Sequence, residues 1–250
     1  NNSLIPLIAE TGGINMMLVD SSALLEQVVD DIMRSSFASA GQRCSALRVL
    51  LVQKEIATDL ISLIKGAMNE LVVGSSEDFS VDVGPIINEG SSIKLKDYVK
   101  SMDVIFQADI KDEIKNIFPP TLLKINNLSE INEEIFGPIL HVVEYDAENL
   151  NDILEQINSK KYGLTMGIHS RIQSKIEYVC DYCNIGNIYV NRDIIGAVVE
   201  SQPFGGMNLS GSGSKAGGPN YLIQFLNEKV ISTNTVALGG NTELLNLETD

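Results

Sequence analysis

The sequence predicts an α/β fold with a mostly parallel, twisted β-sheet flanked by helices. Two observations lead to this prediction: apolar residues recur at helical spacing in several stretches, and short β-rich runs separate those stretches. Strands that alternate with helices favour βαβ units and hence a parallel sheet. The chain has 250 residues, 44% of them hydrophobic, which is enough for one large domain or two small ones.

Each element follows from local pattern. Residues 22–38 show the clearest helical spacing, and Gly41 follows as a stop signal. Further helices are expected at 55–71, 91–102, 148–159 and 172–183, and strands at 47–52, 120–125, 139–145, 165–169 and 187–190. Residues 201–220 are rich in glycine and aperiodic, which indicates a loop. A late β segment at 230–238 is expected to pair with another chain or domain.

Composition excludes several function classes. The net charge of −15 argues against a nucleic-acid partner, because phosphate binding needs clustered Lys and Arg. There is no run of 18 apolar residues, so no transmembrane helix is expected. Three cysteines do not make a disulfide framework and fit a reducing, cytoplasmic location. The start resembles neither a signal peptide nor an ordinary initiation site, so a piece of a longer protein is expected.

Cys44 is the candidate nucleophile. A free cysteine is usually a small buried hydrophobe, but Cys44 follows a helix and the turn Gly41-Gln42-Arg43, where a nearby cation and backbone amides favour a thiolate. Glu10 lies 34 positions upstream (44 − 10) and directly precedes Thr11-Gly12-Gly13. The glycines permit a sharp turn, so Glu10 is expected at a strand end, where catalytic residues of α/β folds gather. Thiol and carboxylate together can activate a nucleophile and a water molecule.

Other motifs fail on closer reading. The run 211–216 has the spacing of a dinucleotide fingerprint, but the strand that must precede such a motif is missing. Cys180 and Cys183 form a lone C-x-x-C pair, which lacks the further ligands of a zinc site, so no metal is predicted. Both cysteines are expected on a helix face. His141 and His169 lie in strand-like runs and are expected to be structural, which leaves no histidine for a cysteine hydrolase.

Four segments together resemble the aldehyde dehydrogenase superfamily over essentially the whole chain. They are Glu10-Thr11-Gly12-Gly13, Gly41-Gln42-Arg43-Cys44-Ser45, Glu134-Ile135-Phe136-Gly137-Pro138 and Pro203-Phe204-Gly205-Gly206. The resemblance implies that Cys44 is the nucleophile and that Glu10 is the general base that activates water. It also implies that NAD is the cofactor, with Glu134 on the ribose hydroxyls and Phe136 near the nicotinamide. Without the family context, 133–138 is only a helix end followed by a Gly-Pro turn.

Within this superfamily the chain resembles the L-glutamate γ-semialdehyde (Δ1-pyrroline-5-carboxylate) dehydrogenase domains of bifunctional proline-utilization enzymes. The resemblance implies that Ser45 contacts the substrate carboxylate, and that the backbone N–H groups of Gly196 and Ala197 grip the same carboxylate. Small residues permit the close approach that a backbone anion site needs. Phe37 and Phe204 would form an aromatic box around the aliphatic stem, although Phe37 alternatively packs in the core.

The same resemblance divides the chain into three parts: 1–12 as the end of an NAD-binding domain and linker, 13–225 as the catalytic domain, and 226–250 as a C-terminal β segment for oligomer or interdomain contacts. In the family the NAD-binding domain and the amide that completes the oxyanion hole lie upstream of these residues, so the chain alone is expected to be inactive. The expected partners are upstream domains and further copies of the chain. FAD is expected only if a proline dehydrogenase domain precedes these residues in the parent enzyme. That enzyme is expected in the cytoplasm or at the surface of the inner membrane.

Two other functions stay open. One is an aldehyde dehydrogenase for another aldehyde, which would usually carry an apolar anchor loop in place of Gly196 and Ala197. The other is a non-catalytic assembly domain, in which Cys44 would react with alkylating reagents as slowly as Cys180 and Cys183.

Overall fold

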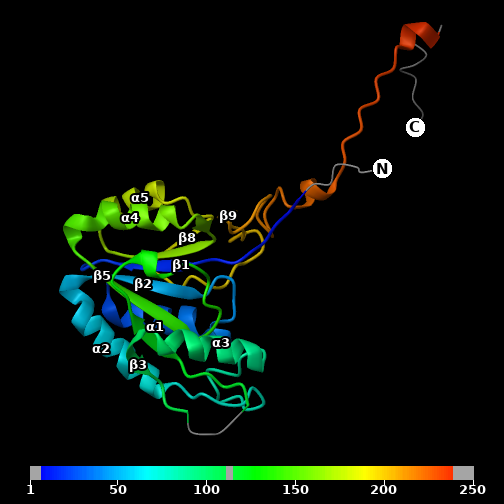
Figure 1. The fold of residues 1–250 in the computed structure, drawn as a ribbon. Helices are drawn as coiled ribbons and strands as arrows, with labels where there is room; N and C mark the ends of the chain where they lie inside the picture. Colours follow the sequence, from blue (N-terminus) through cyan, green and yellow to red (C-terminus); the bar gives the residue numbers. More distant parts are fainter. Residues whose placement is uncertain (1–6, 111–114, 239–250) are drawn as a thin grey trace.

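A seven-stranded sheet forms the centre of the computed structural model, which describes residues 7–110 and 115–238 (Figure 1). Its strand order is β3-β4-β5-β2-β1-β7-β8, and every neighbouring pair is parallel except β3 with β4. The strands are β1 Asn15–Val19, β2 Leu47–Gln53, β3 Asp103–Gln107, β4 Thr121–Lys124, β5 Ile139–Tyr145, β7 Thr165–His169 and β8 Asn187–Val190. The α/β class with a mostly parallel sheet is therefore confirmed.

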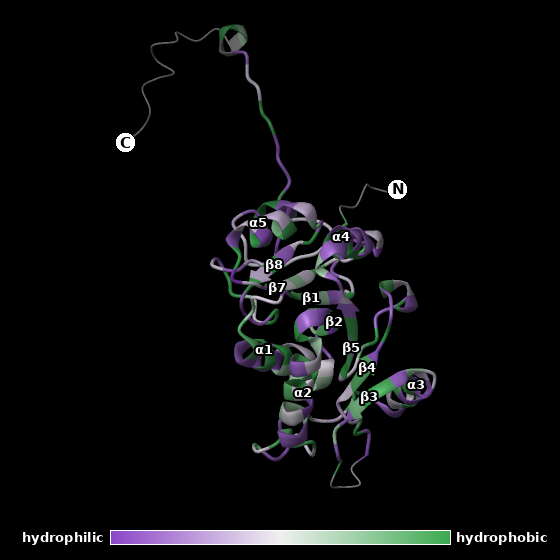
Figure 2. Cartoon of the chain, turned by 90° about the vertical axis from the view of Figure 1, so that its left-hand side faces the viewer, coloured by the Kyte–Doolittle hydropathy of each residue, from purple (hydrophilic) through white to green (hydrophobic). Residues whose placement is uncertain are grey.

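Helices cover both faces of this sheet. The five α-helices of the described residues are α1 Leu25–Phe37, α2 Lys54–Glu70, α3 Glu89–Lys100, α4 Leu150–Ser159 and α5 Gln173–Tyr182. Apolar side chains of α1, α2 and α3 share one core with one face of the strands, and those of α4 and α5 share a second core with the other face. Figure 2 shows the resulting pattern, with hydrophobic strands inside and helices that alternate between hydrophobic and hydrophilic residues. Among the described residues, no helix is both long and apolar enough to cross a membrane.

The sequence locates most of these elements. The strands expected at 139–145, 165–169 and 187–190 are found with those bounds, and each of the five expected helices is present with slightly different ends. The structure adds β1 and β3, which the sequence pattern does not reveal. The five residues of β1 are all buried, so they show no alternation, and β3 is a short, largely exposed edge strand.

The parallel arrangement gives the sheet two chemically different edges. We use the term amino-terminal edge for the three segments that lead into β1, β2 and β5, namely 9–14, 41–46 and 133–138. We use the term carboxyl-terminal edge for the residues that follow β1 and β7 (20–22 and 170–172), together with the last residues of β2 and β5. Cys44 and Glu134 both belong to the amino-terminal edge.

The C-terminal part differs from the expected β segment. Residues 226–234 form no strand with the described part of the chain, and Thr235–Leu238 is a 3-10 helix. The segment projects away from the sheet (Figure 1), and Val230, Ile231 and Val236 are exposed. A strand needs a neighbouring backbone to bond with, and within residues 7–110 and 115–238 no strand or bridge pairs with this segment. The part from 239 onward lies outside the described residues.

Candidate active site

Cys44 lies at the end of a tightly wound turn between α1 and β2. Ser39, Ala40 and Gly41 adopt the left-handed conformation in succession, with φ of 56°, 53° and 64°. That conformation is costly for Ser39 and Ala40, and strain of this kind collects at functional sites. A Cβ on Gly41 would lie 2.2 Å from the carbonyl oxygen of Gly137, so only glycine fits there. The turn leaves the side chain of Cys44 exposed.

Asn15, the first residue of β1, fixes the backbone on both sides of this nucleophile. Its Nδ2 donates to the carbonyl oxygens of Cys44 at 2.7 Å and Ala46 at 2.8 Å, while its Oδ1 accepts from the N–H of Thr165 at 3.2 Å. The residue is buried, so these bonds replace water that the polar groups lose on folding. Asn15 thus ties the Cys44 segment to β1 and β7.

Arg48, on β2, holds the same turn from the other side. Its side chain is 1% exposed, and Nη1 donates to the carbonyl oxygens of Gly41 at 2.6 Å and Gly137 at 3.2 Å. Nη2 donates to the carbonyl oxygen of Arg43 and to Oε1 of Glu134, both at 3.1 Å. A single guanidinium therefore joins the segment before β2 to the segment before β5.

Glu134 and Phe136, predicted on the cofactor side, lie beside Arg48. The other carboxylate oxygen of Glu134, Oε2, accepts from the N–H of Gly13 at 3.2 Å. A Cβ on Gly12 would lie 2.1 Å from this oxygen, so the glycine pair makes room for the carboxylate. Phe136 is 43% exposed, and the Arg48 guanidinium lies 5.1 Å from the centre of its ring. Glu134 and Phe136 also line a pocket of about 280 Å³ between this segment and α3.

Glu10 is exposed and does not follow a strand. The described residues before it are irregular, and β1 begins only at Asn15, so the expectation of a strand end is wrong for the described chain. The glycine-rich loop holds Glu10 instead: Glu10 forms an isolated bridge with Gly211, and the N–H of Thr11 donates to the carbonyl oxygen of Ser210 at 3.2 Å. The candidate site therefore lies at the amino-terminal edge of this sheet, opposite to the edge where parallel sheets usually bind ligands.

The electrostatics at Cys44 differ from the expectation that its surroundings favour a thiolate. Desolvation raises the pKa of Cys44, and the negative charges of Glu134 and Glu10 add to this rise. The backbone N–H groups of Ser45 and of Cys44 itself act in the opposite direction. The two carboxylates that flank the thiol, one from each predicted half of the site, are thus close enough to influence it.

The residues predicted to grip the substrate carboxylate differ in exposure. Ser45 is buried, and its carbonyl oxygen accepts from the hydroxyl of Thr165 at 3.4 Å. Gly196 and Ala197 are exposed, Gly196 has a φ of 91°, and nothing lies within 4 Å of the position of a Cβ. The loop is fixed just before them, since the N–H of Ile194 donates to Oγ of Ser35 at 3.1 Å. Within residues 7–110 and 115–238, no hydrogen bond joins this loop to Ser45, so their shared role stays a prediction.

The two predicted aromatic residues also differ. Phe37 is 1% exposed and belongs to the core beneath α1, in line with the core-packing alternative. Phe204 is half-buried in the glycine-rich loop, where its backbone pairs with Ala216. The neighbouring carbonyl of Gly205 accepts from Nζ of Lys215 at 2.6 Å, which fixes this part of the loop. The substrate contact remains a prediction for both phenylalanines.

The two cysteines and two histidines that were expected to be structural lie within or directly after regular elements. Cys180 and Cys183 lie on α5 and at its end, and burial raises the pKa of both thiols, that of Cys183 to about 12. His141 and His169 are buried in β5 and β7, and burial lowers the pKa of each to about 4. Within 7–110 and 115–238, no group of three or more His, Cys, Asp or Glu side chains is arranged to hold a metal ion.

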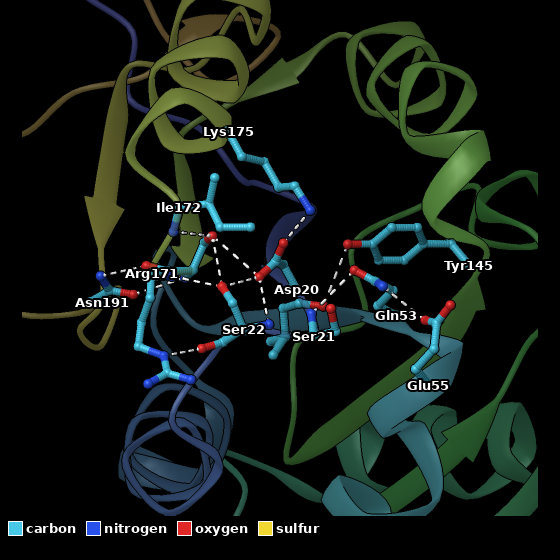
Figure 3. Close-up of polar contacts among 12 residues, drawn as sticks. Asp20, Ser21, Ser22, Gln53, Glu55, Tyr145, Arg171, Ile172, Lys175 and Asn191 are labelled. Atoms are coloured by element: carbon cyan, nitrogen blue, oxygen red, sulfur yellow. Dashed lines mark hydrogen bonds and ion pairs between the residues drawn. The ribbon is translucent and has the colours of Figure 1, made fainter.

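A second polar cluster lies at the carboxyl-terminal edge (Figure 3). Its centre is Asp20, which is fully buried and forms an ion pair with Lys175 of α5. Oδ1 of Asp20 also accepts from the N–H of Ser22 at 2.8 Å and from the hydroxyl of Ser170 at 3.2 Å. Burial works to raise the pKa of Asp20, but the bonds from Lys175 and Ser22 outweigh it and leave that pKa below its usual value. The sequence analysis did not single out this cluster.

The comparisons with known proteins agree with this geometry. The model of the aldehyde dehydrogenase family matches residues 1–231. This chain belongs to the aldehyde dehydrogenase family. It is 46% identical over 245 residues to the bifunctional protein PutA of Escherichia coli K12, and 35% identical over 232 residues to the 1-pyrroline-5-carboxylate dehydrogenase of Bacillus subtilis 168. These alignments cover 94% and 90% of the chain, but only 19% and 45% of the two relatives.

Solved structures give the same fold. A crystal structure of a mutant proline utilization A (PutA) from Bradyrhizobium japonicum superimposes with a TM-score of 0.91 at 46% identity, covering 96% of this chain and 25% of that one. A 1-pyrroline-5-carboxylate dehydrogenase structure matches with a TM-score of 0.82 at 30% identity, covering 88% of this chain and 43% of that one. The sheet with its flanking helices is thus the aldehyde dehydrogenase fold, and the chain spans less than half of each of these relatives.

Asn15 and Arg48 are the site residues that sequence reasoning did not assign. Both are polar residues next to or within runs that become fully buried strands, NMMLV and LRVLLVQ. A charged residue inside such a run is uncommon unless it is paired, and that was the available signal for Arg48. Nothing in the sequence shows which carbonyl oxygens either side chain reaches.

Proposed function

We propose that this chain forms the catalytic part of an enzyme that oxidises L-glutamate γ-semialdehyde to L-glutamate with NAD, a step of proline catabolism. The observation that supports this most is the exposed thiol of Cys44 on a strained turn, with a pKa that the charges of both Glu134 and Glu10 raise. The name of the relative at 35% identity, a 1-pyrroline-5-carboxylate dehydrogenase, supports the substrate class.

The chemistry assigned to Cys44 and Glu10 is covalent catalysis in two stages. The Cys44 thiol gives up its proton to solvent, the thiolate sulfur attacks the aldehyde carbon, and the carbonyl oxygen becomes an alkoxide to which the N–H of Cys44 donates. NAD, when bound, supplies the hydride acceptor. Loss of the hydride from this carbon leaves a thioester on Cys44. Glu10 then takes a proton from water, the resulting hydroxide attacks the thioester, and glutamate leaves as the Cys44 thiolate is restored.

The residues present fit the nicotinamide half of NAD. Glu134 offers a carboxylate that Arg48 and Gly13 hold in one orientation, and Phe136 offers a partly exposed ring beside it. Gly12 leaves free the space next to that carboxylate, which a side chain would fill. No residue of the chain is assigned to the adenosine half, so residues 1–250 alone are expected to bind NAD poorly and to turn over little or no aldehyde.

We assign substrate selection to Ser45, Gly196, Ala197 and Phe204, together with Phe37 as the second predicted aromatic residue. The open space around Gly196 and its left-handed backbone support an approach of a carboxylate to the N–H groups of this loop. An apolar loop at this place would favour simple aldehydes instead.

A steady-state assay tests the proposal. The full-length enzyme is supplied with NAD and either glutamate γ-semialdehyde or propanal, and NADH formation is followed by absorbance. The proposal predicts a kcat/KM for glutamate γ-semialdehyde at least ~10²-fold above that for propanal, since only the former offers a carboxylate to a site of preset donors. Equal values would assign the chain to another aldehyde, and no NADH with either substrate would contradict a catalytic role.

The projecting C-terminal segment supports an additional role in assembly. Val230, Ile231 and Val236 are each more than three-quarters exposed, and such apolar surface is characteristic of contact sites. We propose that 226–238 associates with another copy of the chain or another domain of the same enzyme. A molar mass measured by light scattering, with and without residues 226–250, checks this.

A further inference from the structure

Arg48, on β2, makes four hydrogen bonds to residues of the amino-terminal edge and its surroundings, and the proposed reaction gives it no role. Its two terminal nitrogens make four contacts, all with groups that flank proposed catalytic residues. Two are the carbonyl oxygens of Gly41 and Arg43, which precede Cys44 in the turn. The other two are Oε1 of Glu134 and the carbonyl oxygen of Gly137, which enclose Phe136.

Because the Arg48 side chain is buried, these contacts must offset the free energy of removing its charge from water. Arg48 is 1% exposed, and within the described part of the chain its Nε has no hydrogen-bond partner. Burying a guanidinium costs free energy that an apolar residue of similar size would not cost. Packing alone therefore gives no reason for an arginine at this point of β2, where every neighbour in the strand is apolar or at the strand end.

The geometry of arginine explains what is gained. A planar guanidinium holds several acceptors in fixed directions, whereas a lysine ammonium is a point charge on a flexible stem. Here the fork meets acceptors from two segments: Gly41 and Arg43 lie 7 and 5 positions from Arg48, whereas Glu134 and Gly137 lie 86 and 89 positions from it. The angle between the Cys44 turn and the Glu134 carboxylate is thus set by one rigid group.

We propose that Arg48 is a positioning residue that fixes the Cys44 turn and the carboxylate of Glu134 relative to each other, so that nucleophile and cofactor ribose meet at the correct distance. This inference rests on the proposed function for the identity of the cofactor, but the coupling between the two segments is a property of the chain itself. Loosening either end of the bridge disturbs the other end.

The first test uses Arg48→Lys in the full-length enzyme, with Arg34→Lys as the matched control. Arg34 is exposed, and its ion pair is with Asp193 rather than with a residue of this bridge. Two readouts are taken: the dissociation constant of NAD by calorimetry, and the rate of Cys44 alkylation by iodoacetamide without NAD, by peptide mapping. Arg48→Lys is expected to weaken NAD binding about tenfold, through a misplaced Glu134, and to slow alkylation roughly tenfold, through a misplaced turn. Arg34→Lys changes neither.

The second test approaches the bridge from its more accessible end, in case Arg48→Lys does not fold. Glu134→Gln removes the charge that Arg48 meets, and amide hydrogen exchange of residues 39–46 is followed by mass spectrometry. Exchange in this turn is expected to rise severalfold, because within the described residues the hydrogen bonds of Glu134 go to Arg48 and Gly13 and not to residues 39–46. Unchanged exchange would contradict the coupling.

The outcomes separate the two proposals. A folded Arg48→Lys variant whose alkylation rate is within twofold of wild type, or whose NAD affinity alone changes, overturns the positioning role. If the wild-type enzyme binds no NAD, the proposed function fails, but the alkylation rate of Arg48→Lys and the exchange data for Glu134→Gln still decide whether Arg48 couples the segments.

Discussion

The two edges of the sheet both carry buried polar networks, but they use them differently. At the carboxyl-terminal edge, the carboxylate of Asp20 is fully buried, and Lys175, Ser22 and Ser170 satisfy its oxygens (Figure 3). Next to the amino-terminal edge, buried Asn15 and Arg48 bond mainly to backbone carbonyl oxygens, and Arg48 also to the carboxylate of Glu134, while Cys44 and Glu10 are exposed.

This difference separates a structural cluster from a site. A network whose charged members bind one another stabilises the fold and leaves nothing to meet a ligand. A network that fixes the backbone around exposed reactive groups pre-organises them, and such support is what a catalytic constellation needs. If the number of polar contacts alone were used to locate the candidate site, it would favour the carboxyl-terminal edge.

The largest effect is expected at Cys44. Cys44→Ser in the full-length enzyme is predicted to lower kcat at least ~10³-fold, because a neutral hydroxyl is a far weaker nucleophile than a thiolate. Steady-state NADH formation measures this. Cys180→Ser, the control, retains wild-type kcat, and a similar loss in both variants would remove the distinction between the two thiols.

The next effect concerns stability and belongs to the other edge. Asp20→Ala leaves Lys175 without its partner and is predicted to lower the free energy of unfolding by about 3–5 kcal/mol. Chemical denaturation measures this. Lys54→Met breaks the exposed pair with Asp146 and serves as control, with no measurable change expected. Equal effects of the two substitutions would show that burial of Asp20 contributes nothing.

The same carboxylate gives a pH dependence with a definite sign. The folded-state pKa of Asp20 lies below the unfolded value of about 3.9, so its contribution is complete above that pH and is lost as the pH falls through the folded pKa. Wild type and Asp20→Ala are therefore expected to converge in stability in acid. A difference in unfolding free energy that stays constant from pH 7 to about pH 2 would contradict this.

A smaller effect is expected from Asn15→Ala, which removes support from the amino-terminal edge without touching the thiol. Three buried backbone groups lose their partner, and the resulting displacement of Cys44 is predicted to lower kcat by about 10²-fold while the enzyme remains folded. The rate of Cys44 alkylation is expected to fall with kcat. A variant that loses stability but keeps both rates would make Asn15 purely structural.

The sequence gives access to the fold and to the chemical identity of the site, but not to what holds the site together. Periodicity locates the helices, and the motifs around Cys44, Glu10 and Glu134 can be found in the sequence because the proposed chemistry needs those residue types. Asn15 and Arg48 act mostly through backbone carbonyl oxygens 5 to 89 positions away, and any residue type presents the same carbonyl. Such bonds have no sequence signature.

Two expectations went wrong or stayed undecided for physical reasons that can be named. The placement of Glu10 at a strand end assumed that catalytic groups follow parallel strands, whereas in this sheet they precede them. The amphipathic pattern of α1 predicts that Phe37 faces the core, and its 1% exposure agrees, so spacing alone cannot add a role in substrate contact.

The central claim is that Cys44 carries the substrate as a thioester which Glu10 hydrolyses. It is tested most directly by trapping this species in Glu10→Gln, a full-length variant incubated with glutamate γ-semialdehyde and NAD, quenched in acid and digested for mass spectrometry. The account predicts a glutamyl adduct on the peptide that contains Cys44, formed only when NAD is present and cleared rapidly in the wild type. An adduct on Cys180 or Cys183, or none on Cys44 while NADH is still produced, would contradict it.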